Sequence, residues 1–226
     1  MISDMVMVPA GKAVLTGDLV VPGPIRSVVL FAHGSGSSRH SARNRAVAAE
    51  LHAKGLGTLL LDLLTEREER EDAVTTRHRF DIPLLAGRLV AAIDWLREEP
   101  DTRGVPVGLF GASTGVAAAL VAAAERPERV YAVVSRSGRP DLAGDALERV
   151  RTPVLLMVGG HDEILLRLNK EAAGRLSGPH KVHIVRGATH LFDEPDALEQ
   201  VAAASCDWFL AQAMSRTNGM GKGAAV

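Results

Sequence analysis

Apolar and polar positions follow a repeated order along this chain, in which short apolar runs alternate with amphipathic stretches. The apolar runs predict strands, at residues 28–32, 58–63, 105–110, 130–134, 153–158 and 181–185. The stretches between and after them predict helices, at residues 42–54, 82–97, 116–124, 141–150 and 165–176 and from about residue 194 onward. Strands that alternate with helices pair in parallel through right-handed crossovers. The pattern therefore predicts a mostly parallel, doubly wound α/β sheet.

The first residues depart from this order. Two successive strand patterns, at residues 5–8 and 13–21, flank Pro9 to Lys12, which reads as a turn. A hairpin here adds antiparallel strands to one edge of the sheet. The total is then about eight strands in an α/β fold.

A single serine lies between two glycines where the apolar run 105–110 gives way to an alanine-rich helix. The segment is Gly111-Ala112-Ser113-Thr114-Gly115. A strand, a sharp turn and a helix in this order form a nucleophile elbow, which holds the serine in a strained conformation with its hydroxyl exposed. The alternative is a glycine-rich loop in which Ser113 only caps the helix.

A serine hydroxyl needs a histidine to take its proton and a carboxylate to orient that histidine. Asp162 follows the strand at 153–158, and His190 follows the strand at 181–185. Because the carboxyl ends of parallel strands lie along one rim, we expect both side chains beside Ser113. Two alternatives stay open, namely that Asp162 only caps the next helix and that Glu163 is the acid.

A glycine- and serine-rich loop, residues 33–38, follows the apolar strand at 28–32. Its backbone amides suit an oxyanion hole, and we assign the two donors to the amides of Ser35 and Thr114. His33 is expected to be structural, bonded to the loop backbone. The alternative, a phosphate-binding loop, lacks the Gly-x-Gly-x-x-Gly spacing.

Together these motifs make the chain resemble the α/β-hydrolase superfamily, and within it the small, lidless members similar to dienelactone hydrolases. The resemblance runs from about Met5 to Leu210. It implies a serine hydrolase that cleaves small soluble carboxylic esters or lactones through an acyl-enzyme, with Ser113, His190 and Asp162 as the triad. Dienelactone hydrolases proper carry cysteine at the elbow, so their lactone substrate is not carried over.

The same triad also serves acyltransferases and thioesterases, and a non-catalytic binding module with this fold is a further alternative. The segments 33–45 and 135–142 also resemble a bacterial subgroup that is joined, in some chains, to a phosphoribosyltransferase domain. We expect no such domain in this chain.

The composition agrees with one compact domain. The chain has 226 residues, 46% of them hydrophobic, and we expect a single domain over residues 1–213 with a flexible tail at 214–226. With 26 basic against 27 acidic residues, nucleic acid is not an expected partner. No apolar stretch approaches membrane-spanning length, and we expect a cytoplasmic protein. No cofactor or metal is expected, and the lone Cys206 is expected to be buried and inert.

Basic side chains follow two of the predicted strands. Arg39, Arg43 and Arg136 are candidates for binding an anionic substrate, because guanidinium groups bind carboxylates bidentately. The alternative is pairing with the acidic run at residues 66–72. The charged segment 65–79 is expected to be a mobile loop, with a gating flap as the alternative. The short connection 136–144 leaves little room for a lid, so we expect a shallow, open site.

Overall fold

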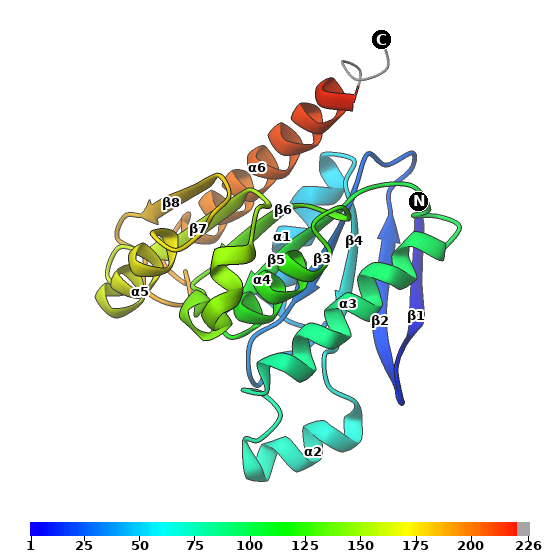
Figure 1. Cartoon of the computed structure of the whole chain (residues 1–226), viewed down its shortest axis with the longest axis horizontal. Coiled ribbons are helices and arrows are strands. Elements are labelled where there is room, and N and C mark those ends of the chain that lie inside the picture. The colour runs from blue at the N-terminus through cyan, green and yellow to red at the C-terminus, as the bar shows by residue number, and fades with distance from the viewer. Residues whose placement is uncertain (221–226) are drawn as a thin grey trace.

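The computed structural model describes the backbone of residues 1–220 and the side chains of residues 1–215. Within these residues a single eight-stranded sheet has the order β1-β2-β4-β3-β5-β6-β7-β8 (Figure 1). The strands are β1 (Ile2–Ala10), β2 (Ala13–Val21), β3 (Val28–Ala32), β4 (Gly57–Leu61), β5 (Val107–Ala112), β6 (Val130–Arg136), β7 (Val154–Gly159) and β8 (His180–Val185). The pairs β1–β2 and β2–β4 are antiparallel and all others are parallel. The predicted sheet with its antiparallel amino-terminal edge is confirmed.

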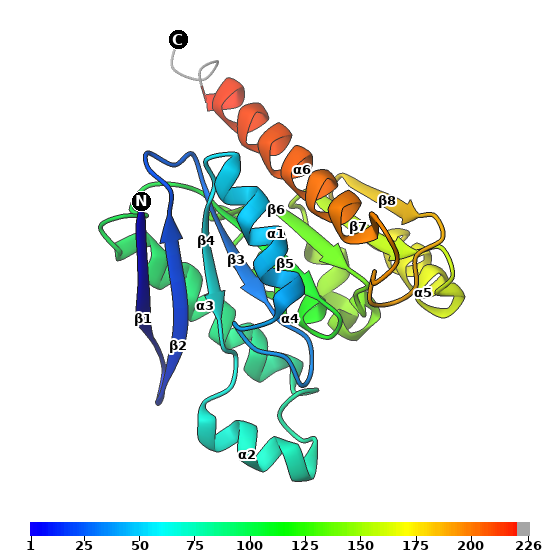
Figure 2. The ribbon, with the colours of Figure 1, turned by 180° about the vertical axis from the view of Figure 1, so that it is seen from behind.

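Helices cover both faces of this sheet (Figures 1 and 2). The described helices are α1 (Ala42–Ala53), α2 (Glu66–Thr75), α3 (Ile82–Glu98), α4 (Gly115–Glu125), the 3₁₀ segment η1 (Pro140–Arg149), α5 (Glu163–Ala173) and α6 (Ala197–Met220). One apolar cluster joins the sheet to α3, α4, η1 and α5, and a second joins the other face to α1 and α6. Strands β3 and β5 are buried along their whole length because helices cover both of their faces. The ring of Phe31 on β3 packs against the ring of Phe110 on β5, with ring centroids 4.8 Å apart.

The carboxyl ends of the parallel strands form one rim of the sheet, and α2 projects beyond that rim (Figures 1 and 2). The expectation of a mobile loop at residues 65–79 is wrong, because Glu66–Thr75 is helical. Thr65 and Glu68 form a capping box, in which each side chain accepts a hydrogen bond from the backbone amide of the other residue. Glu68 also pairs with Arg88 of α3, and this contact lowers the pKa of Glu68 to about 2.

Several element boundaries differ from those expected. β1 begins at Ile2 and continues through Pro9 to Ala10, so that only Gly11 and Lys12 form the turn. Pro9 is accommodated because an edge strand leaves one side of its backbone unpaired. The 3₁₀ segment at 140–149 replaces the expected helix and is kinked at Gly144.

At the other end of the chain, α6 continues to Met220, past the boundary expected at 214, and residues 221–226 lie outside the described part. No helix within the described residues has both the length and the apolar character needed to cross a membrane.

Candidate active site

Ser113 forms the sharp turn between β5 and α4. Its φ of 50° lies in the left-handed region, where a residue with a side chain is strained. The backbone holds it there, since the Ser113 amide donates to the carbonyl oxygen of Arg136 at 3.2 Å, and the Ser113 carbonyl accepts from Arg139 at 3.1 Å. The side chain remains half-buried at the rim. This is the geometry of a nucleophile elbow.

The glycines of the elbow permit contacts that no side chain would allow. A Cβ added to Gly115 would lie 2.3 Å from the carbonyl oxygen of Ala32, and one added to Gly111 would lie 2.7 Å from Cα of Val116. Helix α4 therefore begins directly against the end of β3. This close contact between the start of α4 and the end of β3 brings the loop after β3 beside Ser113.

Asp162 and His190 meet on the loops that follow β7 and β8. The Nδ1 of His190 lies 3.0 Å from Oδ2 of Asp162. The other oxygen, Oδ1, accepts the amide of Leu165 at 3.1 Å and so caps α5. Asp162 therefore contacts His190 through one oxygen and caps α5 through the other. Glu163 makes no contact with His190 in the described structure, which leaves Asp162 as the partner of the histidine.

Backbone contacts fasten the two loops to each other. The amide of Gly160 donates to the carbonyl of Val185 at 2.9 Å, and the amide of His161 donates to the carbonyl of Ala188 at 3.0 Å. A Cβ on Gly159 would lie 2.4 Å from the carbonyl oxygen of Thr189. The histidine loop thus lies across the end of β7.

Ser113 and His190, the candidate nucleophile and base, share no hydrogen bond in the described structure. Neither Oγ of Ser113 nor Nε2 of His190 has a hydrogen-bond partner among the described residues. The His190 side chain is 45% exposed, which leaves it room to move. Catalytic hydrogen bonds are often long or misaligned in unliganded enzymes and tighten when substrate binds. The structure therefore brings together Asp162 and His190, with Ser113 on the same rim.

The loop after β3 packs against the nucleophile. A Cβ on Gly34 would lie 2.9 Å from Cβ of Ser113, so this backbone passes directly beside the serine. The His33 ring is buried, with Nδ1 2.9 Å from the carbonyl of Gly34 and Nε2 accepting the amide of Leu63 at 3.0 Å. Burial lowers the pKa of His33 and keeps the ring neutral. The structural role expected for His33 is confirmed.

The two expected oxyanion donors differ in state. The amide of Thr114 has no acceptor in the described structure. The amide of Ser35 donates to Oγ1 of Thr114 at 3.1 Å. Among the described residues the Thr114 amide is therefore free, whereas the Ser35 amide is bound to the Thr114 hydroxyl. The spacing of residues along the chain does not reveal this acceptor.

Most arginines near the rim are already paired, although not with the acidic run at 66–72. Arg39 contacts Asp62 and Asp18, and Arg43 holds Asp193 with bonds of 2.9 to 3.1 Å. The acidic run has partners of its own, such as Arg79 for Asp72. The alternative in which these arginines pair with carboxylates is therefore correct for Arg39 and Arg43. Their partners, however, are Asp18, Asp62 and Asp193 rather than the acidic run at 66–72.

Arg136 is the exception among the three candidates. Its Nη1 is shielded from solvent and has no hydrogen-bond partner among the described residues. Burial and, to a smaller extent, the charge of Arg43 lower the pKa of Arg136 to about 10, and the charge of Asp193 opposes this shift. Buried charges are normally paired, so this guanidinium is an unsatisfied positive group near the histidine loop.

A cavity of about 350 Å³ lies beside the oxyanion loop. Residues 33–38 and Thr114 form one wall, Leu63, Leu64 and Leu85 contribute apolar surface, and Ala73 and Asp72 of α2 form another wall. Helix α2, which was expected to be a loop, therefore bounds a space next to the nucleophile. Its capping signal, Thr65 followed three residues later by Glu68, is visible in the sequence.

Cys206 is buried, as expected, and burial raises its thiol pKa to about 11. Such a thiol is a poor nucleophile at neutral pH. Across the described residues, no three His, Cys, Asp or Glu side chains gather into a metal-binding group.

Comparisons with known proteins agree with this fold. A model described as the dienelactone hydrolase family matches residues 21–214. A crystal structure of dienelactone hydrolase from Anabaena variabilis is 54% identical, with a TM-score of 0.91, over 92% of this chain and 97% of that chain. Est1E from Butyrivibrio proteoclasticus, solved with ferulic acid bound, shares the fold at 19% identity and a TM-score of 0.78, over 92% of this chain and 98% of its own.

A protein of Mycobacterium tuberculosis, provisionally named a phosphoribosyl transferase, is 56% identical over 205 residues. The match covers 91% of this chain and 45% of that protein, so the chain spans less than half the length of this relative.

Proposed function

The chain belongs to the dienelactone hydrolase family, and from this premise we propose that it is a serine hydrolase that cleaves small, soluble carboxylic esters or lactones. The observation that carries the proposal is the bond of 3.0 Å between Asp162 and His190 on the rim that also holds the strained Ser113. A serine elbow and an oriented histidine are what nucleophilic acyl transfer requires.

In the first half of the reaction, Nε2 of His190 takes the proton of Ser113 as Oγ attacks the carbonyl carbon. The carbonyl π electrons move to oxygen, and the amides of Thr114 and Ser35 donate to that oxyanion. Ser35 contributes once its amide leaves the Thr114 hydroxyl. When the tetrahedral intermediate collapses, His190 returns the proton to the leaving alkoxide and an acyl-enzyme remains.

In the second half, His190 removes a proton from water, and the hydroxide attacks the acyl carbon. Collapse releases the carboxylic acid, and Ser113 recovers its proton from His190. Asp162 keeps its charge throughout, fixes the tautomer of His190 and stabilises the imidazolium. No other group has to supply or accept a proton.

The surroundings of Ser113 support a small substrate. The cavity of about 350 Å³ beside the oxyanion loop lies near the lower end of the range for ligand sites. The connection after β6 leads at once into η1 and inserts no lid. We expect rates to peak with short acyl groups rather than rise through palmitoyl esters.

The unpaired Nη1 of Arg136 favours a substrate that also carries a carboxylate. Arg39 and Arg43 are less suited, since Asp62 and Asp193 already neutralise them. A carboxylate-bearing ester is expected to be preferred over its neutral analogue about tenfold, and Arg136→Ala is expected to lose this preference. Equal selectivity in both proteins would contradict the anionic substrate.

The test of the catalytic proposal is labelling by a fluorophosphonate probe, which reacts with activated serines. The wild type is expected to label and Ser113→Ala is not, whereas Ser177→Ala, which changes an exposed serine outside the cavity, is expected to label like the wild type. Absence of labelling in the wild type would favour a non-catalytic module.

A panel of short esters, lactones and thioesters, with and without an alcohol acceptor, then separates hydrolysis from acyl transfer and thioester cleavage. Pyrophosphate release from phosphoribosyl diphosphate tests the activity in the name of the longer mycobacterial relative.

A further inference from the structure

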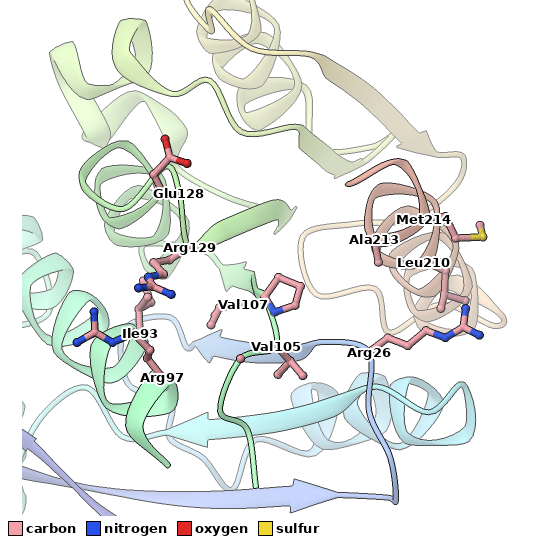
Figure 3. Close-up of a pocket in the computed structure, with 12 residues that line it drawn as sticks. Arg26, Ile93, Arg97, Val105, Val107, Glu128, Arg129, Leu210, Ala213 and Met214 are labelled. Atoms are coloured by element: carbon pink, nitrogen blue, oxygen red, sulfur yellow. The ribbon is translucent and has the colours of Figure 1, made fainter. Parts of the chain in front are cut away.

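A second cavity, of about 470 Å³, lies at the opposite rim of the sheet, where the parallel strands begin (Figure 3). It is bounded by α3, by the segment that enters β5 and by α6. The six residues of β5 separate this rim from the elbow by roughly 20 Å. The cavity is therefore distinct from the space beside Ser113.

The cavity has an apolar floor. Val105 and Val107 lie at its centre, and Ile93 of α3 and Leu210 of α6 flank them (Figure 3). Pro106, between the two valines in sequence, also lines the cavity. Its volume falls within the range of small-molecule sites. A hydrocarbon chain or an aromatic ring buried here would remove apolar surface from water.

The rim of the cavity is basic. Figure 3 shows the Arg26 side chain extending toward Leu210 on the α6 side, while Arg97 and Arg129 stand on the α3 side. Neither Arg26 nor Arg129 has a side-chain hydrogen bond or an ion pair among the described residues. Arg97 pairs with Glu98, and the lining also includes the carboxylate of Glu128.

Asp94 is a described carboxylate whose charge reaches this rim from outside the cavity lining, and it is already bound elsewhere. Asp94 lies within electrostatic reach of Arg97 and Arg129, but both of its oxygens bind Arg126, at 3.1 and 2.8 Å. Among the described residues, the exposed guanidinium groups of Arg26 and Arg129, on opposite sides of the apolar floor, therefore lack a partner. A guanidinium binds a carboxylate through paired hydrogen bonds, and the floor offers nothing to a purely polar anion.

We propose that this cavity is a binding site for a small amphiphilic carboxylate, whose apolar body lies on Val105, Pro106 and Val107 and whose carboxylate is held by Arg26 or Arg129. The site is independent of the hydrolytic chemistry at Ser113, so either proposal can fail without the other.

The test is isothermal titration of the full chain with octanoate, and with octanamide as the uncharged probe of the same length. We expect octanoate to bind about tenfold more tightly than octanamide. At least one of Arg26→Gln and Arg129→Gln is expected to weaken octanoate binding about fivefold, and both are expected to leave octanamide binding unchanged. Ala213→Trp, which places an indole on the α6 wall, is expected to abolish binding of both probes.

Two controls locate the effect. Arg77→Gln removes an exposed arginine outside the cavity, and Ser113→Ala changes the other rim; both are expected to bind octanoate like the wild type. Equal affinity for the two probes, no binding of either probe, or arginine variants that both match the wild type would overturn the proposal. Unchanged binding by Ala213→Trp would place octanoate elsewhere and would overturn it as well.

Discussion

The two halves of the candidate active site are built differently. Ser113 lies at the junction of a fully buried strand and a helix whose first residues are buried, and glycine contacts fix that junction. Asp162 and His190 lie on loops beside β8, an edge strand that is largely exposed, and His190 itself is 45% exposed. The backbone sets the position of the nucleophile, whereas side-chain and loop hydrogen bonds set the position of the base.

This difference explains why Ser113 and His190 share no hydrogen bond in the described structure. A strained serine in a packed core has one position, so any closing movement falls to the histidine loop. A movement of the exposed histidine loop costs less free energy than a movement of the packed elbow. We therefore expect changes in the backbone of the first half to act mainly on stability and changes in the second half to act mainly on rate.

The largest expected effect is that of Asp162→Asn. Asparagine still caps α5, so stability should change by less than about 1 kcal/mol. The charge that orients His190 is lost, and kcat/KM should fall about 10³- to 10⁴-fold. Ester hydrolysis and thermal unfolding measured side by side check both expectations. A rate near that of the wild type would remove Asp162 from the triad.

Two glycine substitutions compare the halves directly. Gly115→Ala meets the carbonyl of Ala32 within the packed core and should cost about 3 kcal/mol or more of unfolding free energy. Gly159→Ala meets the carbonyl of Thr189 in the histidine loop, which can shift. We expect it to cost less stability but to lower kcat/KM about 100-fold, because the shift misplaces His190.

Urea unfolding and ester hydrolysis on both variants provide the comparison, and Gly87→Ala, on α3 with open space around its Cβ position, is the control. If Gly159→Ala proves the less stable of the two, the contrast between the halves is wrong.

The smallest expected effect is a pH dependence in the nucleophile half. Burial lowers the pKa of His33, so the unfolded chain takes up a proton there more readily than the native protein. The contribution of neutral His33 to the free energy of unfolding is therefore complete above about pH 6.5, the pKa of the unfolded chain. It is lost as the pH falls from there through the lower pKa of the native protein.

Urea titrations between pH 7.5 and 5 should therefore show a steeper loss of stability in the wild type than in His33→Gln. The difference is at most about 1.4 kcal/mol per pH unit, the limit for one proton. His40→Gln, at an exposed position after the same loop, serves as the comparison. Parallel titration curves for the wild type and His33→Gln would refute the assignment.

The strand and helix order could be predicted because apolar runs and turn residues are local signals. The pairing of Asp162 with His190 could be predicted because strand ends share a rim. Helix α2 was missed because its charge density outweighed the capping signal of Thr65 and Glu68.

Other features depend on tertiary contacts. The Thr114 hydroxyl that engages the Ser35 amide and the aspartates that pair with Arg39 and Arg43 come from segments far apart in the chain. The arginine-rimmed cavity is also assembled from distant segments. No local pattern carries such information.

The two oxygens of Asp162 have a consequence for protein engineering. Many hydrolases with a similar triad use glutamate as the acid, and one codon change would introduce it here. A longer side chain cannot keep both the amide of Leu165 and the imidazole of His190 in place, so the start of α5 would fray as the new carboxylate reached its target. Exchanging the acid in this protein therefore requires redesign of the whole first turn that follows it.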